Sequence, residues 1–313
     1  MRMLDPKIQK KLDTIVELPT IPTVMSHVLA ALDNPKLSAN QLASLIERDQ
    51  TLTAKVLKVA NSPFYGFARK ISTIDLAVVI LGINVLKEIV LSLLIQKFFS
   101  RLSKSMFDVK SFWNYSLFCG AAAKLLARKL GYKLAGEAFV AGLMHDLGIL
   151  IIIENFRKQF GEIRKLQKAK NVSITDAEMQ VLGATHADIG LWLAEKWNLP
   201  PKLCLAIKNH HTNYKDFLTS KDKKNITEDV DFHEIDQPLT AIVSLSEWFA
   251  QIMEYKQWDK NYTPPPYYLS EELFEDLSEE DFLDPDSAFE LLKKEIIEEF
   301  QKAAIFGDIS IRA

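Results

Sequence analysis

Residues 138–153 read Ala138-Phe-Val-Ala-Gly-Leu-Met-His-Asp-Leu-Gly-Ile-Leu-Ile-Ile-Ile153 and form the most apolar stretch of the chain. This run of 16 residues includes the ionisable pair His145-Asp146, whereas a membrane span needs ~20 apolar residues. Small side chains and His145 recur along it at the spacing of one helix face. The stretch therefore predicts a buried helix from Glu137 to about Phe156, despite the strand propensity of Ile149–Ile153.

Capping patterns on either side of this stretch predict further helices. The capping-box form, in which two side chains satisfy free helix amides, is found in Ser38-Ala-Asn-Gln41, Ser72-Thr-Ile-Asp75 and Thr185-His-Ala-Asp188. A further helix is expected after Asp49, and another begins at Pro201, whose missing N–H is not needed in a first turn. No run reads as an alternating strand, so we predict an all-α fold.

The expected helices fall into two packed subdomains and an extension. Beyond residue 81 they cover Asn84 to about Phe99, Phe112–Leu130, Ile189–Trp197, Pro201 to about His211, Pro238 to about Trp258 and Ser287–Ala304. The polar, basic segment Ser100–Lys110 separates an N-terminal helical bundle, residues 1–106, from a helical core, residues 107–260. Residues 261–313 are expected to form a proline linker and an acidic C-terminal extension.

Composition places the chain among ordinary globular proteins. Of its 313 residues, 48% are hydrophobic and 25% are charged, which is enough apolar material for a large core. Cys119 and Cys204 cannot build a disulfide framework, so a reducing compartment is expected. Residues Met1–Lys10 lack the apolar core of a signal peptide. We therefore expect a cytoplasmic protein that does not enter a membrane.

The net charge of −3 conceals an uneven distribution. Between Glu271 and Glu299 there are 13 acidic and 2 basic residues, whereas the remainder carries 36 basic and 28 acidic residues. The acidic segment is either a solvated tail or a cover for a basic surface that would compete with an anionic ligand. The polar segment Thr212–Asp236 is expected to be a surface loop. The body is not basic enough to require a nucleic-acid partner.

Ionisable side chains recur on successive apolar helices of the predicted core. They are His145, Asp146, His186, His210, His211 and Glu247. Imidazole and carboxylate together suit a divalent transition metal, namely iron, manganese or zinc. Burying them is costly unless they pair with one another or bind metal, so a polar network without metal is the alternative. Because adjacent helical residues point about 100° apart, only one of His210 and His211 is expected to face inward.

Several segments, in this order, resemble the HDOD (HD-related output domain) family of bacterial signalling proteins, within the HD superfamily. The resemblance runs from about Leu18 to Trp248. It rests on Leu18-Pro19-Thr-Ile-Pro22, Ile46-Glu-Arg-Asp49, Leu57-Lys-Val-Ala-Asn-Ser62, Phe64-Tyr-Gly66, Ala77-Val-Val-Ile-Leu-Gly82, Phe112-Trp113, Ala141-Gly-Leu-Met-His-Asp-Leu-Gly148, His186-Ala-Asp-Ile-Gly190 and Ile207-Lys-Asn-His-His211. It implies an all-α fold with an HD-like helical core.

The resemblance also implies roles for the ionisable side chains. Catalytic HD phosphohydrolases bind metal through a leading His, a His-Asp pair and a trailing Asp, with extra histidines in members that hold two metals. The pair is matched by His145-Asp146, and His186 with either His210 or His211 resembles the extra histidines. Glu247 stands where the trailing Asp is expected.

Two departures from the catalytic pattern are visible. Tyr115 occupies the position of the leading His, and a neutral phenol with a pKa near ~10 is a poor replacement for imidazole. The segment after His211 lacks the Gly-Tyr-Pro signature of the HD-GYP phosphodiesterases. The resemblance therefore favours a non-catalytic output module of signal transduction that acts through protein or ligand binding. Its partners would be signalling proteins whose identity the sequence does not give.

Two other functions are weighed against this one. The first is a metal-dependent phosphohydrolase acting on a nucleotide or related phosphate ester, in which Asp146 would be catalytic by orienting water or bridging a second ion. The second is DNA binding by the helix pair within Ser38–Asn61. Its supposed recognition helix carries Lys55 and Lys58 but is mostly apolar, whereas DNA reading needs an exposed polar face.

Overall fold

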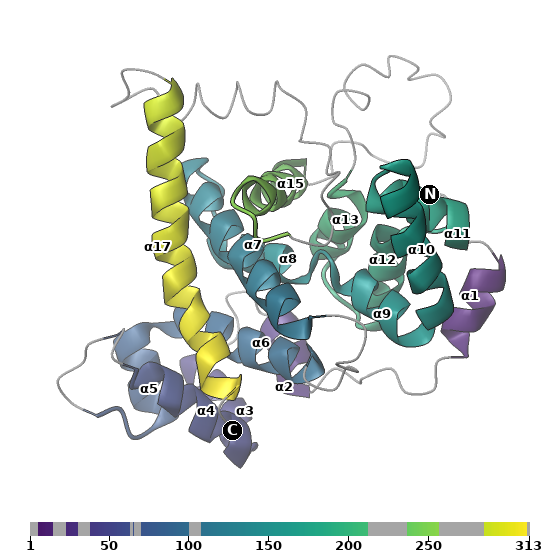
Figure 1. Ribbon diagram of the computed structural model, residues 1–313. Helices are drawn as coiled ribbons and strands as arrows, with labels where there is room; N and C mark the ends of the chain where they lie inside the picture. The colour runs from purple at the N-terminus through teal and green to yellow at the C-terminus, as the bar shows by residue number, and fades with distance from the viewer. Residues whose placement is uncertain are drawn as a thin grey trace, which may run out of the picture.

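The computed structural model describes residues 6–14, 23–30, 38–62, 65, 70–99, 108–211, 237–256 and 285–311. All the regular elements in these ranges are α-helices, which confirms the predicted all-α fold (Figure 1). The expectations for Leu18–Pro22, Thr212–Asp236 and the proline linker lie outside the described residues.

The N-terminal helices begin at two of the three predicted caps. The bundle comprises α2 (Thr23–Ala30), α3 (Ala39–Glu47), α4 (Gln50–Ala60), α5 (Ile74–Leu81) and α6 (Ile83–Phe99). Ser38 makes its capping box, and Asp49 accepts a hydrogen bond from the amide of Leu52. The cap of α5 is Thr73, one residue after the expected Ser72. Gly82 then adopts a φ of 84°, which ends α5 and lets α6 begin in a new direction.

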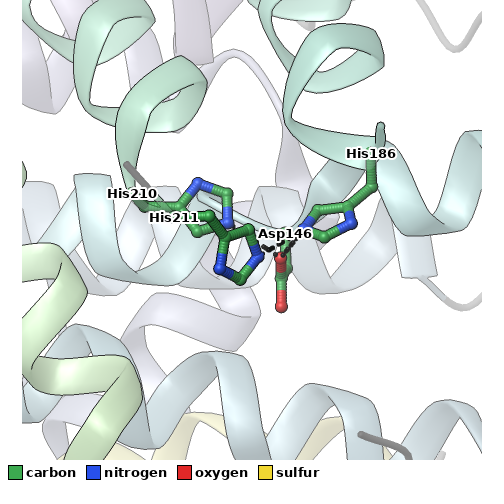
Figure 2. A group of neighbouring side chains, drawn as sticks. All are labelled: Asp146, His186, His210 and His211. Atoms are coloured by element: carbon green, nitrogen blue, oxygen red, sulfur yellow. Dashed lines mark hydrogen bonds and ion pairs between the residues drawn. The ribbon is translucent and has the colours of Figure 1, made fainter. Parts of the chain in front are cut away.

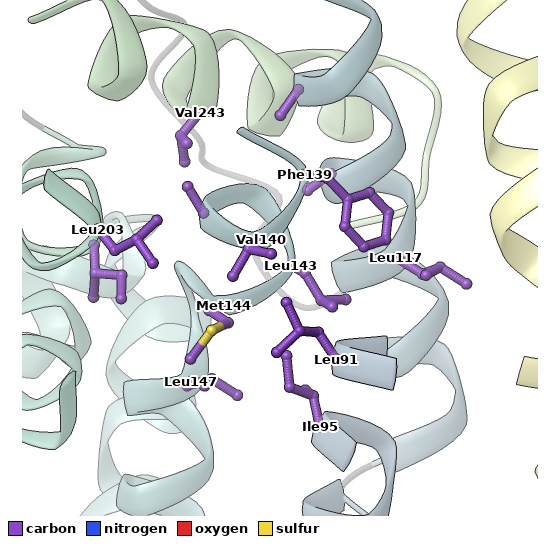
Figure 3. Close-up of a cluster of buried hydrophobic side chains, with 14 of the residues drawn as sticks. Leu91, Ile95, Leu117, Phe139, Val140, Leu143, Met144, Leu147, Leu203 and Val243 are labelled. Carbon is purple, nitrogen blue, oxygen red and sulfur yellow. The ribbon is translucent and has the colours of Figure 1, made fainter. Parts of the chain in front are cut away.

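The core consists of longer helices packed face to face. They are α7 (Val109–Lys129), α8 (Ala135–Met144), α9 (Leu147–Asn155), α10 (Arg157–Lys170), α11 (Ile174–Leu182), α12 (His186–Lys196), α13 (Pro201–Asn209) and α15 (Gln237–Ile252). A continuous apolar cluster joins α6, α7, α8, α13 and α15, as Leu91, Leu117, Leu143, Leu203 and Val243 show in Figure 3. The helix α1 (Pro6–Asp13) lies against this core, where the ammonium of Lys11 is 4.0 Å from the ring centroid of Phe156.

Glycine allows α7 and α8 to approach closely. A Cβ on Gly142 would lie 2.5 Å from the carbonyl oxygen of Cys119 on α7, a distance that backbone atoms cannot accommodate. The same α7 buries Tyr115 in the core. Close packing here places Tyr115 beside the carboxyl end of α8.

The single helix predicted from Glu137 to Phe156 is wrong at its centre. The chain forms two helices, α8 and α9, separated by His145-Asp146, and Asp146 has φ −98° and ψ 11°. The apolar side chains on both sides of the pair are buried and give no local sign of an interruption. Asp146 stands at the N-cap of α9 but makes no side-chain capping bond, so its carboxylate is available to the interior.

A close contact between backbones locks α9 onto α12. A Cβ on Gly148 would lie 1.9 Å from the carbonyl oxygen of His186 and 2.7 Å from the amide nitrogen of Gly190. Only a residue without a side chain fits this crossing. Since His186 is the first residue of α12, the crossing holds His186 against the start of α9 and therefore against Asp146.

Two C-terminal elements end differently from prediction. The helix predicted to reach Trp258 ends at Ile252, where the amide of Tyr255 donates to the carbonyl of Ala250. The last helix, α17 (Pro285–Ile311), is longer than expected and lies along α7 (Figure 1). Glu299 on α17 is 3.3 Å from the ammonium of Lys124 on α7, so this acidic helix covers basic groups of the core.

One stretch has the length and apolarity of a membrane span. It is Ala135–Asn155, which covers α8 and α9, and 94% of its most apolar window is buried inside the protein. The helices α5 and α6 pass the same test only as a pair bent by 120°. The burial of the first stretch fits the prediction that it is a core segment.

We expect Gly148→Ala to be severely destabilising, because the new methyl group would collide with the backbone of α12. The expected loss is about 3 kcal/mol or more in the free energy of unfolding, measured by urea denaturation. Gly161→Ala on α10 is the matched control, since nothing lies within 4 Å of its added Cβ. That variant should gain about 0.5–1 kcal/mol. Equal stability of both variants would show that the α9–α12 crossing is looser than described.

Candidate metal centre

The predicted site residues come together at the centre of the core. Asp146 precedes α9, His186 opens α12, and Glu247 lies within α15. His145 follows α8, while His210 and His211 follow the last residue of α13. Five separate helices thus deliver their side chains, or the residue at their end, to one place.

This cluster is buried except at one edge. His145, His186 and Glu247 have no exposed area, and Asp146 and His210 are each 1% exposed. The side chain of His211 is 19% exposed and forms the edge nearest to solvent. The expectation that only one of His210 and His211 faces inward is wrong. His210 keeps helical dihedrals at the end of α13, and the ligand nitrogens of both histidines nevertheless reach the cluster.

Three imidazole rings are fixed with the same nitrogen pointing inward. The Nδ1 of His145 is 2.7 Å from the carbonyl oxygen of Gly142, and the Nδ1 of His210 is 2.6 Å from that of Ile207. The Nδ1 of His186 lies 2.7 Å from Oε2 of Glu178. In each ring an acceptor at Nδ1 holds a proton there and leaves Nε2 facing the centre, where a neutral ring offers its lone pair. Metal-binding histidines are commonly oriented in this way.

Glu178 on α11 was not found by sequence analysis. It is buried, and its Oε2 also accepts a hydrogen bond of 2.8 Å from the backbone amide of His186. No motif marks this residue, and its distance of eight positions from His186 matches no local periodicity. Burial lowers the pKa of His186, but the charges of Glu178 and Asp146 outweigh it and raise this pKa to about 10. Without metal, His186 is therefore a cation held between two carboxylates.

Asp146 is the hub of the cluster (Figure 2). Its Oδ1 lies 3.0 Å from Nε2 of His186 and 3.3 Å from Nε2 of His210. The Nε2 of His186 is in turn 2.8 Å from Nε2 of His211. Burial would raise the pKa of Asp146, but nearby cationic groups, including Lys256 and His186, hold it well below its usual range. Asp146 is therefore ionised at neutral pH.

Unsatisfied atoms show that this donor set fits a metal ion. Among the described residues, Nε2 of His210 and Oε2 of Glu247 are buried without a hydrogen-bond partner, and Oδ1 of Asp146 contacts only the imidazoles of His186 and His210. Orphaned polar atoms of this kind are costly unless an ion or water satisfies them. Ligand atoms of Asp146, His186, His210 and His211 lie within 4.8 Å of one another, as do those of His145, His210 and Glu247. Both sets combine imidazole with carboxylate, which suits iron, manganese or zinc.

Tyr115 closes one side of the cluster. Its hydroxyl donates a hydrogen bond of 2.9 Å to Oδ2 of Asp146 and lies 2.9 Å from Nε2 of His145. Burial, together with the negative charge of Asp146, raises the pKa of Tyr115 well above its usual value. Tyr115 therefore keeps its proton and acts as a hydrogen-bond donor at this position.

Comparison with known proteins assigns the chain to a family. The family model for the HDOD domain matches residues 18–213. The chain belongs to the HDOD family. That match includes the His145-Asp146 pair and extends as far as both terminal histidines of the cluster.

Solved structures share the fold of this HDOD protein. An HDOD domain protein of unknown function from Geobacter sulfurreducens is 24% identical, with a TM-score of 0.73 and coverage of 96% of this chain and 99% of that one. A Shewanella amazonensis protein, provisionally named a phosphohydrolase, is 22% identical, with a TM-score of 0.64 and coverage of 96% and 98%. A Marinobacter aquaeolei protein, provisionally named a signal transduction protein, is 21% identical, with a TM-score of 0.69 and coverage of 99% and 62%.

A longer relative is found in Treponema pallidum. That protein, named as uncharacterized, is 27% identical over an alignment of 225 residues, and the alignment covers 69% of this HDOD chain. The aligned region is 43% of the relative, so the chain spans less than half of that protein's length.

Lys256 is a second member of the cluster that sequence analysis missed. Its side chain is fully buried, its ammonium pairs with Oε1 of Glu247, and it lies 3.9 Å from Oδ2 of Asp146. It follows the end of α15 in a segment that was predicted to continue as helix. Because a straight helix was predicted through residue 256, the prediction did not place the side chain of Lys256 in the core.

We expect Tyr115→Phe to destabilise the HDOD core, because Oδ2 of Asp146 would lose the phenol that donates to it. Loss of a hydrogen bond to a buried acceptor costs about 1–3 kcal/mol, which chemical denaturation in the presence of chelator would detect. Tyr255→Phe is the control, since the Tyr255 hydroxyl makes no hydrogen bond to any described residue. The control should change stability by less than about 0.5 kcal/mol. Equal effects would mean that the Tyr115 hydroxyl contributes nothing specific.

Proposed function

We propose that this HDOD chain is a non-catalytic regulatory module of signal transduction. It acts by binding a signalling protein. Alternatively, it acts by binding a nucleotide or another phosphate ligand. A cytoplasmic setting is part of the proposal and is supported by the two free, buried cysteines. The observation that carries it is Tyr115, which donates to Asp146 where the resemblance places a histidine ligand in catalytic members.

Burial of the cluster supports the same conclusion. A phosphate ester would have to reach Asp146 and the inward nitrogens of the histidines. Asp146 and His210 are 1% exposed, and only His211 of the cluster has appreciable exposed area in the described part of the chain. In the described conformation the cluster is therefore suited to holding helices together rather than to receiving a substrate.

The proposal includes one bound transition metal. Iron, manganese or zinc would be held by Asp146 and the inward nitrogens of His186, His210 and His211. Glu178 would fix the ring of His186 for this purpose. A metal bound by residues from α9, α12 and α13 would stabilise the packing of these helices.

The second candidate is a metal-dependent phosphohydrolase, and the donor set is the observation that favours it. One carboxylate and three imidazoles are a sufficient ligand set for a catalytic metal, which supplies Lewis-acid chemistry to a phosphate oxygen or a water. The residues of the chain would then orient the reactants, with Asp146 as the group nearest to the water. Turnover would require the buried cluster to open at the edge formed by His211.

A hydrolysis assay separates the two functions. We expect wild-type protein, supplied with manganese, iron(II) or zinc, to show no hydrolysis of nucleotides or aryl phosphates above that of His145→Ala. The reason is that Tyr115 stands where catalytic members have a histidine ligand, and that the cluster is too buried for a phosphate ester to reach it. His27→Ala, on the exposed face of α2, controls for contaminating phosphatases. Hydrolysis that is present in wild type and His27→Ala but lost in His145→Ala would establish the enzyme instead.

A search for partners tests the regulatory role directly. We expect chemical crosslinking in cells of the source organism to capture a specific signalling protein, since the proposal gives the chain no output of its own. The control is a Gly148→Ala variant, whose disrupted core should lose the partner. Repeated failure to find any partner that distinguishes the two forms would count against a regulatory module.

A further inference from the structure

Lys256 is a fully buried cation in a place where metal ligands gather. Its ammonium contacts Oε1 of Glu247, lies 3.9 Å from Oδ2 of Asp146 and is 5.7 Å from the ring centroid of Tyr115. Burying an ammonium group costs several kcal/mol unless opposite charges compensate it. The two carboxylates provide that compensation, and the aromatic face adds a weaker attraction.

The chain makes a specific turn to bring Lys256 inside. After α15 the amide of Tyr255 donates to the carbonyl of Ala250 and the amide of Glu254 donates to that of Gln251, which is the Schellman pattern. Glu254 adopts a φ of 60°, in the left-handed region that usually favours glycine. The ring of Tyr255 then stacks on Phe118 with centroids 4.3 Å apart. Lys256 is therefore placed by an anchored turn.

The contacts of Lys256 and Tyr115 divide the cluster into two halves. One half consists of Oδ1 of Asp146 with the rings of His186, His210 and His211. In this half Oδ1 contacts only imidazole nitrogens, and Nε2 of His210 has no hydrogen-bond partner. The other half is the second group of possible ligands, His145, His210 and Glu247.

Most ligand atoms of the second half already face groups of the chain itself, and Oε2 of Glu247, which has no hydrogen-bond partner, lies 3.6 Å from Nδ1 of His211. The Nε2 atom of His145 lies against the hydroxyl of Tyr115. The Oε1 atom of Glu247 is paired with Lys256. An ion in this half would have to displace an ammonium group from between two carboxylates, which like-charge repulsion opposes.

We propose that the ammonium of Lys256 is a built-in cation that takes the place of a second metal ion in the core. The cluster then accepts a single transition metal, on Asp146, His186, His210 and His211. Lys256 neutralises Glu247 and Oδ2 of Asp146, so that the second half needs no ion. This inference concerns the number of ions that the core holds, and it applies whether or not the protein hydrolyses a substrate.

Removing the ammonium charge of Lys256 should allow a second ion to bind in the half formed by His145, His210 and Glu247. Lys256→Met keeps an unbranched side chain that is one atom shorter, and it leaves Glu247 buried without its counterion. That variant should be less stable than wild type without metal and should bind a second divalent ion that restores the lost stability. The double variant Lys256→Met/Glu247→Gln removes both charges, so it should recover stability without metal and bind no second ion.

Lys124→Met is the matched control for loss of a buried ammonium. Lys124 on α7 is also buried and pairs with Glu88 and Glu299, at 2.6 Å and 3.3 Å, away from the cluster. The three variants and wild type would be purified without chelator or nickel resin and loaded separately with zinc, manganese and iron(II). Metal per chain would be measured by elemental mass spectrometry, and unfolding midpoints would be measured with metal and with chelator.

The expected result is one ion per chain in wild type, Lys124→Met and the double variant, and two in Lys256→Met. Metal should also raise the unfolding midpoint of Lys256→Met by about 5 °C more than that of Lys124→Met at saturating concentration. Wild type that takes up two ions or none, or a Lys256→Met variant that binds no more than wild type, would overturn the proposal. If Lys256→Met does not fold, a stable double variant supports the proposal and an unstable one contradicts it. The hydrolysis assay above tests the proposed function separately.

Discussion

The carboxylate of Asp146 imposes the constraint on which the core depends. It is 1% exposed, and a buried negative charge must be compensated by hydrogen bonds or positive charge. The chain supplies Tyr115 and Lys256 near Oδ2, and His186 and His210 near Oδ1. These groups come from α7, α12, the end of α13 and the turn after α15, so satisfying one carboxylate requires four segments to pack correctly.

Two features of the backbone bring these groups together. The interruption between α8 and α9 releases Asp146 from a helical position, and the contact at Gly148 brings the first turn of α12 alongside. Glu178 then sets the ring of His186 from the opposite side. Burial favours neutral forms of these groups, yet the mutual attraction of opposite charges prevails for His186 and Asp146, whose pKa values move in the direction of ionisation. The cluster is thus an ionic centre even before any metal is considered.

The elements that local rules govern could be predicted from the sequence. The capping box at Ser38, the capping box at Thr185 and the proline at the start of α13 depend only on neighbouring residues, and the structure confirms all three. The break at His145-Asp146 could not be predicted because flanking apolar residues fit a continuous helix equally well. The residues missed in the site, Glu178 and Lys256, act across distances in the chain that no spacing rule covers.

In the proposed core, the ammonium of Lys256 replaces one of two cations around Asp146. Anomalous X-ray diffraction at the absorption edge of the bound metal, on crystals grown with zinc, manganese or iron(II), tests this most directly. We expect one anomalous peak, beside Oδ1 of Asp146 and the Nε2 atoms of His186 and His210, with the ammonium of Lys256 on Glu247. Two peaks, or a Lys256 side chain that lies outside the cluster while metal contacts Glu247, would contradict it.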